Sequence, residues 1–205
     1  MSTTLHPPYK TNALAPGLRV GLFGGSFNPA HEGHLHVSRM AIQALGLDRL
    51  WWMVSPQNPL KSTNDMAPFA QRFASAERMA RHPHIVVSDI EQKLGTRFTA
   101  DTLRALKARN PQVQFIWLMG ADNLIQFTKW ENWQDIARAV PVAVYPRPGY
   151  SLQARLSPAA KWYGDNQINA LAAKNLADTQ APALVFLDGP EHPASATAIR
   201  AQSKS

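Results

Sequence analysis

The chain alternates apolar segments of strand length with segments of helical length, starting at residue 18. The apolar runs predict strands at 18–24, 48–54, 84–87, 113–119, 140–145 and 183–187. The segments between them predict helices at 33–46, 68–81, 99–109 and 153–176, short helices within 122–137, and a last helix near Ala196. We expect Gly46 to end the first helix and Thr99 to be the N-cap of the third. Alternation of this kind predicts an α/β fold with a doubly wound parallel sheet and right-handed crossovers, a Rossmann-like arrangement.

The composition fits one globular domain. With 205 residues and 45% hydrophobic content the chain can bury a sizeable core. We expect a flexible, Pro-rich tail at residues 1–17 and a single domain at residues 18–205. The sequence has no cysteine, which excludes disulfides, thiolate metal sites and a cysteine nucleophile. No apolar run approaches the roughly 18 residues of a membrane span and the N-terminus has no apolar signal core, so we expect a cytoplasmic protein without a membrane partner.

The net charge of +7 indicates anionic partners. Lysines and arginines are scattered through the sequence, with no basic block and no aromatic signature of an RNA-binding domain. Small substrates that carry several phosphates account for the sign of the charge more simply than nucleic acid does. A basic surface without a function is the alternative, and a homo-oligomer is compatible with the sequence.

A glycine-rich turn follows the first predicted strand. Residues 21–34 read GLFGGSFNPAHEGH, so Gly24 and Gly25 precede a helix that begins beside His31 and His34. Glycines let the backbone approach a ligand, and the N-terminus of a helix favours negative charge. The spacing differs from a Walker loop, from G-x-G-x-x-G and from the H-E-x-x-H of zinc proteases. The segment therefore predicts a polyphosphate site; an ordinary Gly/Pro turn with exposed histidines is the alternative.

A zinc site is the competing interpretation of these histidines. His31, His34 and His36 are close in sequence, and imidazoles are common zinc ligands. No fourth ligand occurs at a suitable spacing, and His34 and His36 diverge on a helix. We therefore expect no metal ligand from side chains.

Other polar segments follow the later strands. They are residues 55–61, 120–122, Arg147 and 195–200. In doubly wound sheets, ligands bind beyond the carboxyl ends of the strands, so these segments are expected to meet at one edge. The last of them, SATAIR, predicts a capped helix start followed by Arg200, which can bind phosphate.

These motifs carry a resemblance. GGSFNPAHEGH at 24–34 resembles the signature of the nucleotidyltransferase superfamily with an H-x-G-H motif, and SATAIR resembles its S-x-T-x-I-R element. From residue 18 to 200 the chain resembles the bacterial nicotinate mononucleotide adenylyltransferases. That likeness is carried by NPLK at 58–61, RFTADTL at 97–103, WLMGADNL at 117–124, Lys129 and Trp130 with Trp133, and YPRPGY at 145–150.

The resemblance implies a nucleotidyltransferase of NAD biosynthesis. Such an enzyme transfers AMP from ATP to nicotinate mononucleotide, giving deamido-NAD and pyrophosphate, by direct in-line attack without a covalent intermediate. Mg²⁺ would arrive with ATP. Glu131 stands where the family has a Tyr-like residue, so a ring contact at that position would be lost.

The resemblance also implies site residues. The catalytic pair would be His31 and His34. ATP would be bound by these two histidines and by Gly24, Gly25, Ser26, Phe27, Gly120, Asp122, Ser195, Thr197 and Arg200. Nicotinate mononucleotide would be bound by Lys61, Arg72, Thr99, Trp130 and Arg147. Several also have a structural alternative, such as helix capping for Asp122, core packing for Trp130 and a solvated surface for Lys61 and Arg72.

Three other functions stay open from the sequence. A pantetheine-phosphate adenylyltransferase shares the H-x-G-H chemistry, although those chains lack the run from WLMGADNL to PRPGY. A non-catalytic nucleotide-binding module would bind ATP without releasing pyrophosphate. A nucleic-acid-binding protein would show affinity that falls steeply with salt.

Overall fold

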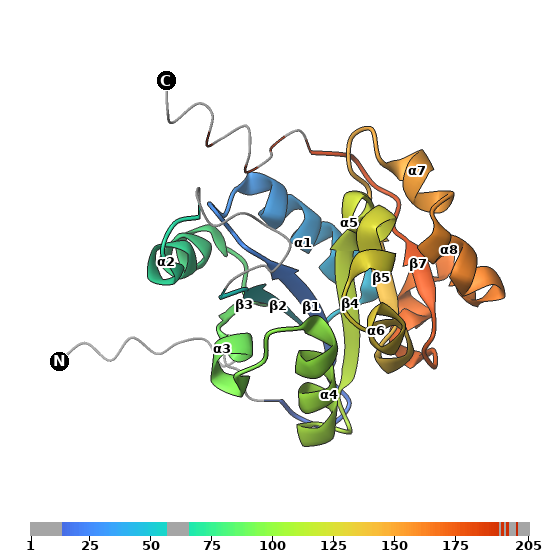
Figure 1. The fold of residues 1–205 in the computed structure, drawn as a ribbon, viewed down its shortest axis with the longest axis horizontal. Coiled ribbons are helices and arrows are strands. Elements are labelled where there is room, and N and C mark those ends of the chain that lie inside the picture. The colour runs from blue at the N-terminus through green and yellow to red at the C-terminus, as the bar shows by residue number, and fades with distance from the viewer. Residues whose placement is uncertain (1–13, 57–65, 193, 195, 197–199, 201–205) are drawn as a thin grey trace.

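The computed structural model describes residues 14–56, 66–192, 194, 196 and 200 and contains one parallel sheet of seven strands. The strands are β1 (Arg19–Gly25), β2 (Arg49–Val54), β3 (Ile85–Ser88), β4 (Gln114–Gly120), β5 (Val142–Tyr145), β6 (Gln167–Ile168) and β7 (Leu184–Phe186). Their order across the sheet is β3-β2-β1-β4-β5-β7-β6, and every neighbouring pair is parallel. The predicted doubly wound α/β fold is confirmed (Figure 1).

Helices cover both faces of this sheet (Figure 1). One face packs against α4 (Thr99–Arg109), α5 (Ala121–Gln126), α6 (Trp133–Ala139), α7 (Ser151–Arg155) and α8 (Pro158–Tyr163). The other packs against α1 (Glu32–Leu45), α2 (Phe69–Met79) and the 3₁₀ segment η3 (Ala170–Asp178). The remaining helical pieces are α3 (Ile90–Leu94), η1 (Phe127–Lys129) and η2 (Gly164–Asn166).

Side chains along the central strands alternate between the two faces. In β4, Phe115 and Trp117 pack against the α4 side, whereas Ile116 and Leu118 pack against the α1 side. Because helices cover both faces, the buried positions within such a strand are apolar on both sides, and the polar residues Arg19 and Gln114 stand at the strand starts. This explains why the strands read as continuous apolar runs in the sequence.

The segment predicted as one helix at 153–176 is divided in the structure. Pro158 is the first residue of α8, after Ser157, whose hydroxyl accepts a hydrogen bond from the Ala160 N–H. Gly164 follows α8 with a φ of 49°, a backbone conformation that favours glycine. The prediction of a continuous helix was wrong because its alanines outweighed the breaking signals at Pro158 and Gly164, and β6 was missed because it has only 2 residues.

The predicted N-cap of α4 was also wrong. Phe98 is the residue before the helix, with φ −111° and ψ 144°, and Thr99 is already helical. The end of α1 was predicted correctly, since Gly46 terminates it with φ 62°. Of the predicted tail, residues 1–13 lie outside the described residues, whereas the Gly17 N–H donates to the carbonyl of Gln112 (2.8 Å).

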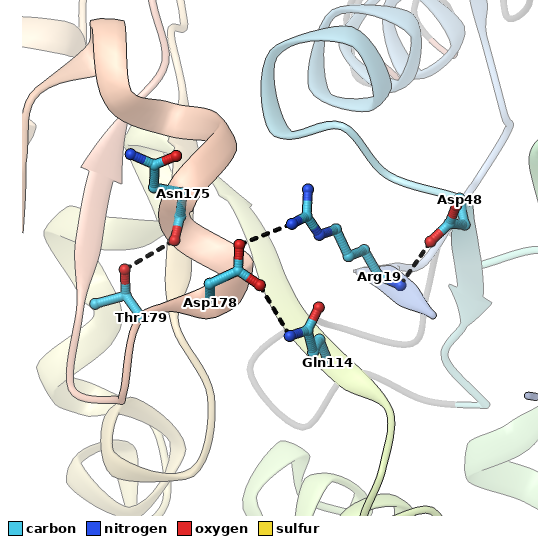
Figure 2. Close-up of polar contacts among 6 residues, drawn as sticks. All are labelled: Arg19, Asp48, Gln114, Asn175, Asp178 and Thr179. Carbon is cyan, nitrogen blue, oxygen red and sulfur yellow. Dashed lines mark hydrogen bonds and ion pairs between the residues drawn. The ribbon is translucent and has the colours of Figure 1, made fainter. Parts of the chain in front are cut away.

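A polar cluster fastens η3 to the amino-terminal edge of the sheet (Figure 2). The Arg19 guanidinium lies 2.7 Å from the carboxylate of Asp178, and the Gln114 amide donates to the same carboxylate at 2.9 Å. The backbone N–H of Arg19 donates to Asp48 at 2.8 Å. These groups are partly exposed, so we assign the ion pair at most about 1 kcal/mol. The cluster lies at the amino ends of the strands, whereas the glycine-rich turn lies at their carboxyl ends.

No helix in the described part of the chain has the length and apolar character needed to cross a bilayer.

Two leucines test the packing. Leu103 of α4 is fully buried against the sheet, whereas Leu171 of η3 is 97% exposed. We expect Leu103→Ala to lower the free energy of unfolding by about 2–5 kcal/mol, since it leaves a cavity. Leu171→Ala removes the same atoms from an exposed position, so its free energy of unfolding should stay within about 0.5 kcal/mol of the wild-type value. Urea unfolding measures both variants, and equal destabilisation would contradict the assigned packing.

Candidate functional site

The glycine-rich turn leaves the carboxyl end of β1 with very little space around it. A Cβ on Gly24 would lie 2.7 Å from the Trp117 ring, and one on Gly25 would lie 3.2 Å from the Phe27 ring. Phe27 itself has a φ of 47°, which non-glycine residues rarely adopt. Its ring is buried and stacks on Trp52 of β2, with centroids 5.1 Å apart. Packing therefore fixes the backbone of this turn.

His31 and His34 form a capping box at the start of α1. The Gly33 N–H donates to Nδ1 of His31, and the His31 N–H donates to Nδ1 of His34, both at 3.1 Å. The ring centroids are 3.9 Å apart. A nitrogen that accepts a hydrogen bond carries no proton, so a neutral ring here holds its proton on Nε2. Each imidazole is thus set to donate through Nε2 at the positive end of a 14-residue helix.

A hydroxyl inside the core holds the backbone of His34. Ser38 is fully buried and donates to the His34 carbonyl at 2.7 Å. The indole N–H of Trp52 donates to the same hydroxyl at 2.7 Å. The His34 ring also lies against Phe27, with centroids 4.8 Å apart. Trp52 therefore supports both the turn, through Phe27, and the helix start, through Ser38.

The environment of His31 keeps its ring neutral. Burial, then the positive charge of Arg147 and then His192, lower the pKa of His31 to about 4. Its side chain is 6% exposed. At neutral pH this group is a hydrogen-bond donor without a charge, in a place where Arg147 supplies a positive charge nearby.

Asp122 and Arg147 meet at the ends of β4 and β5. Their side chains approach to 3.4 Å between Nε and Oδ1, and about a third of each is exposed. A Cβ on Gly120 would collide with the Asp122 carboxylate and come within 3.0 Å of the Tyr145 hydroxyl. Burial raises the pKa of Tyr145, so this hydroxyl stays protonated. The structure thus joins two residues that the sequence analysis had assigned to different substrates.

Arg72 is buried rather than presented to solvent. Its guanidinium donates to the carbonyls of Ser26, Ser55, Pro56 and Ala67 at 2.7–2.9 Å, and the residue is 2% exposed. It therefore ties the loops after β1 and β2 to the start of α2. Its predicted contact with a mononucleotide stays a prediction, and its visible role is to shape the loops.

Arg200 lies beside the glycine-rich turn. It donates to the carbonyl of Asn28 at 2.7 Å. The Asn28 side chain accepts from the Ala67 N–H at 3.2 Å. Both residues line a groove of about 1010 Å³ that runs along α2. Lys61, Ser195 and Thr197, which the sequence analysis also named, lie outside the described residues.

Trp130 and Thr99, which were predicted to bind the pyridine ring, lie on the α4 face of the sheet. Trp130 follows η1 and is half-buried, with its ring edge-to-face against Trp117 and Phe127 at 6.3 Å and 5.5 Å. Thr99 begins α4, which packs against α6. Both residues therefore belong to the same side of the sheet.

Glu91 is a residue that sequence reasoning missed. It lies in α3, is 9% exposed, and hydrogen-bonds to Ser55 beyond the end of β2. Burial raises its pKa to about 7, and the bond to Ser55 opposes part of this rise. Its place just after β3, at the same edge as the other polar segments, was the signal that could have identified it.

The three histidines of the zinc interpretation point to different partners. His36 donates from Nε2 to the Pro190 carbonyl at 2.8 Å, whereas Nδ1 of His31 and of His34 accepts from the backbone. Within the described residues, no group of three or more His, Asp or Glu side chains could hold a metal ion.

Comparison with known proteins gives consistent results. Residues 22–202 match the family model described as Cytidylyltransferase-like. A probable nicotinate-nucleotide adenylyltransferase of Parvibaculum lavamentivorans is 65% identical over 187 residues, covering 91% of this chain and 93% of the relative. One from Caulobacter sp. strain K31 is 54% identical, covering 89% and 97%. The fold is similar to Plasmodium falciparum nicotinic acid mononucleotide adenylyltransferase complexed with NaAD, with TM-score 0.67, 15% identity, and coverage of 90% and 83%.

Ser38→Ala tests the support beneath His34. The substitution leaves the Trp52 indole N–H buried without its acceptor, so we expect a loss of about 1–3 kcal/mol in unfolding free energy. Ser75→Ala in α2 is the matched control, because no hydrogen bond of that hydroxyl occurs among the described residues. Denaturant titration measures the unfolding free energy of both variants. A loss in Ser38→Ala no larger than in Ser75→Ala would contradict the role of the Ser38 hydrogen bonds.

The lowered pKa of His31 predicts a pH effect on stability. An unfolded chain protonates this group near 6.5, and the folded chain near 4. The contribution of neutral His31 to the free energy of unfolding is therefore fully present above about pH 6.5. It is lost as the pH falls towards 4, and the loss amounts to about 3 kcal/mol. His31→Asn keeps a capping side chain without this titration, so its unfolding free energy should fall less over that range. Parallel pH curves for the two proteins would show that His31 titrates normally.

Proposed function

The chain belongs to the cytidylyltransferase-like family and, within it, to the nicotinate-nucleotide adenylyltransferases, which are nucleotidyltransferases of NAD biosynthesis; from this premise we propose that it transfers AMP from ATP to nicotinate mononucleotide. The products are deamido-NAD and pyrophosphate. A cytoplasmic location without nucleic-acid partners, as expected from the sequence, is part of this proposal.

The capping pair His31 and His34 is the observation that carries the proposal. In the reaction a phosphate oxygen of the mononucleotide bonds to the α-phosphorus of ATP, while the bond from that phosphorus to the pyrophosphate oxygen breaks. Attacking and leaving groups are both phosphate oxygens, so no protein group has to form a covalent intermediate. The protein must place two anions and stabilise the charge that develops. Two Nε2–H donors at a helix N-terminus suit that task.

The residues proposed to bind ATP lie, like the histidines, at the carboxyl ends of the strands. Gly25 and Ser26 would offer backbone N–H groups to the nucleotide, and Asp122 would accept from the hydroxyls of the ribose. Arg200 would bind the phosphates of ATP because it carries a fixed positive charge, whereas Arg147, paired with Asp122, keeps its assignment to nicotinate mononucleotide. Mg²⁺ would enter as MgATP, with its ligands supplied by phosphate and water.

The acceptor side is proposed for the α4 face. The pyridine ring would stack on Trp130, and its carboxylate would accept from backbone N–H groups at the start of α4, near Thr99. Lys61 is assigned to the phosphate of the mononucleotide. Arg72 would act through the loops it ties together, because its donors are engaged by carbonyls.

The test is pyrophosphate release from MgATP with three acceptors. We expect nicotinate mononucleotide to exceed nicotinamide mononucleotide and phosphopantetheine by at least about tenfold in kcat/KM. His34→Ala should fold and lose about two to three orders of magnitude in kcat. His84→Ala should stay active, because His84 lies at the amino ends of the strands, away from the candidate site, where its ring bonds to the Asp48 carbonyl.

Other outcomes identify the alternatives. Preference for phosphopantetheine would indicate a pantetheine-phosphate adenylyltransferase. Saturable ATP binding without pyrophosphate release for any acceptor would indicate a binding module. A fully active His34→Ala variant would remove the catalytic role from the capping pair.

A further inference from the structure

Trp117 fills the space between the glycine-rich turn and Trp130. It lies in β4 paired with Leu22 of β1, and it is 2% exposed. Its six-membered ring occupies the place where a Cβ on Gly24 would be, with Cη2 at 2.7 Å and Cζ2 at 3.3 Å from that position. The ring therefore extends along β1 from Leu22 to Gly24, towards the carboxyl edge where the site lies.

The same ring sets the position of Trp130. The two indoles meet edge-to-face, with centroids 6.3 Å apart and an interplanar angle of 83°. Phe127 contacts Trp130 from η1 in the same manner, at 5.5 Å and 81°. Trp130 follows η1 in extended conformation, with φ −78° and ψ 144°, outside any helix or strand. Of its ring contacts within the described residues, the one with Trp117 comes from the sheet and the one with Phe127 from η1.

Trp51 shows that core packing alone does not explain Trp117. Trp51 pairs with the same Leu22 from β2, belongs to the same face, and is also 2% exposed. Within the described part of the chain, neither indole N–H has a hydrogen-bond partner. The two residues therefore share burial and the unpaired N–H. They differ in that only Trp117 contacts Trp130 and fills the space over Gly24.

We infer that Trp117 is a positioning residue for the acceptor substrate. Its indole spans from the glycine-rich turn to Trp130 and holds the Trp130 ring at a fixed place relative to that turn. A pyridine ring stacked on Trp130 is thereby presented at a set distance from the nucleotide bound at Gly24 and Gly25. A phenylalanine at position 117 lacks the second ring and cannot fill both contacts. The inference rests on the proposed function, which assigns Trp130 to the acceptor.

The first experiment detects the contact without any activity. The protein is labelled with 5-fluorotryptophan, which gives ¹⁹F signals for its six tryptophans. Trp130→Phe identifies the signal of Trp130. We expect Trp117→Phe to shift or broaden this signal, whereas Trp51→Phe, which removes the same atoms from the same face, leaves it in place. An unchanged Trp130 signal in Trp117→Phe would overturn the inference.

The second experiment measures the consequence for the reaction. We expect Trp117→Phe to raise KM for nicotinate mononucleotide about fivefold to tenfold, with kcat within about twofold. KM for ATP should rise by a smaller factor of about twofold to threefold, because the same ring packs against Gly24. Trp51→Phe should leave all three constants within about twofold. In a Trp130→Ala background, Trp117→Phe should add less than about twofold, because a residue that acts through Trp130 has no further effect once that ring is gone.

The outcomes separate this inference from the proposed function. Equal constants for the Trp117 and Trp51 variants, an equal rise in both KM values, or full additivity with Trp130→Ala would overturn the positioning role while the proposed function stands. If the wild-type protein does not adenylate nicotinate mononucleotide, the proposed function fails, and the ¹⁹F spectra still decide whether Trp117 orients Trp130. Should Trp117→Phe fail to fold, Trp117→Tyr, which retains more of the volume, takes its place in both experiments.

Discussion

Two backbone N–H groups at the start of α1 donate to two imidazoles, and the geometry of the candidate site depends on this pair of hydrogen bonds. They fix Nδ1 of His31 and of His34 as acceptors, which leaves Nε2 as the donor of each neutral ring. A helix start normally needs a Ser, Thr, Asp or Asn to satisfy its first N–H groups. Here the two imidazoles that cap the helix are also the groups proposed to bind phosphate. The hydrogen bonds that start α1 therefore also orient the proposed phosphate donors.

Tryptophans support the site from both faces of the sheet. On the α1 face, Trp52 stacks on Phe27 and donates to Ser38, which in turn bonds to the His34 carbonyl. On the α4 face, Trp117 lies over Gly24 and against Trp130. Both come from strands adjacent to β1, the strand that leads into the glycine-rich turn. The turn is therefore held by rigid rings on either side, as a site that must align two substrates requires.

Sequence reasoning located most elements; it misjudged one helix from its local composition and missed contacts between residues that are distant in the chain. The apolar runs of the central strands were identified because burial on both faces makes the positions beyond the first residue of these strands apolar or glycine. The helix predicted at 153–176 failed because alanine content outweighed Pro158 and Gly164. For Arg72, no local pattern shows that four carbonyls from two loops surround its guanidinium, and its contact with a mononucleotide stays a prediction. Glu91 was overlooked for the same reason, as its burial and its bond to Ser55 arise only on folding.

By itself the sequence determined the layered α/β fold and the end of the sheet at which the polar segments gather, because strand and helix periodicity and the glycine-rich turn are local properties of the chain. Only the tertiary structure decided which nitrogen of each histidine accepts a backbone hydrogen bond, that Asp122 and Arg147 form a pair, and that Trp117 rather than Trp51 contacts Trp130. These features depend on the order of strands in the sheet and on the directions of side chains from separate elements. Contacts between residues far apart in the chain set both, and no local pattern records them.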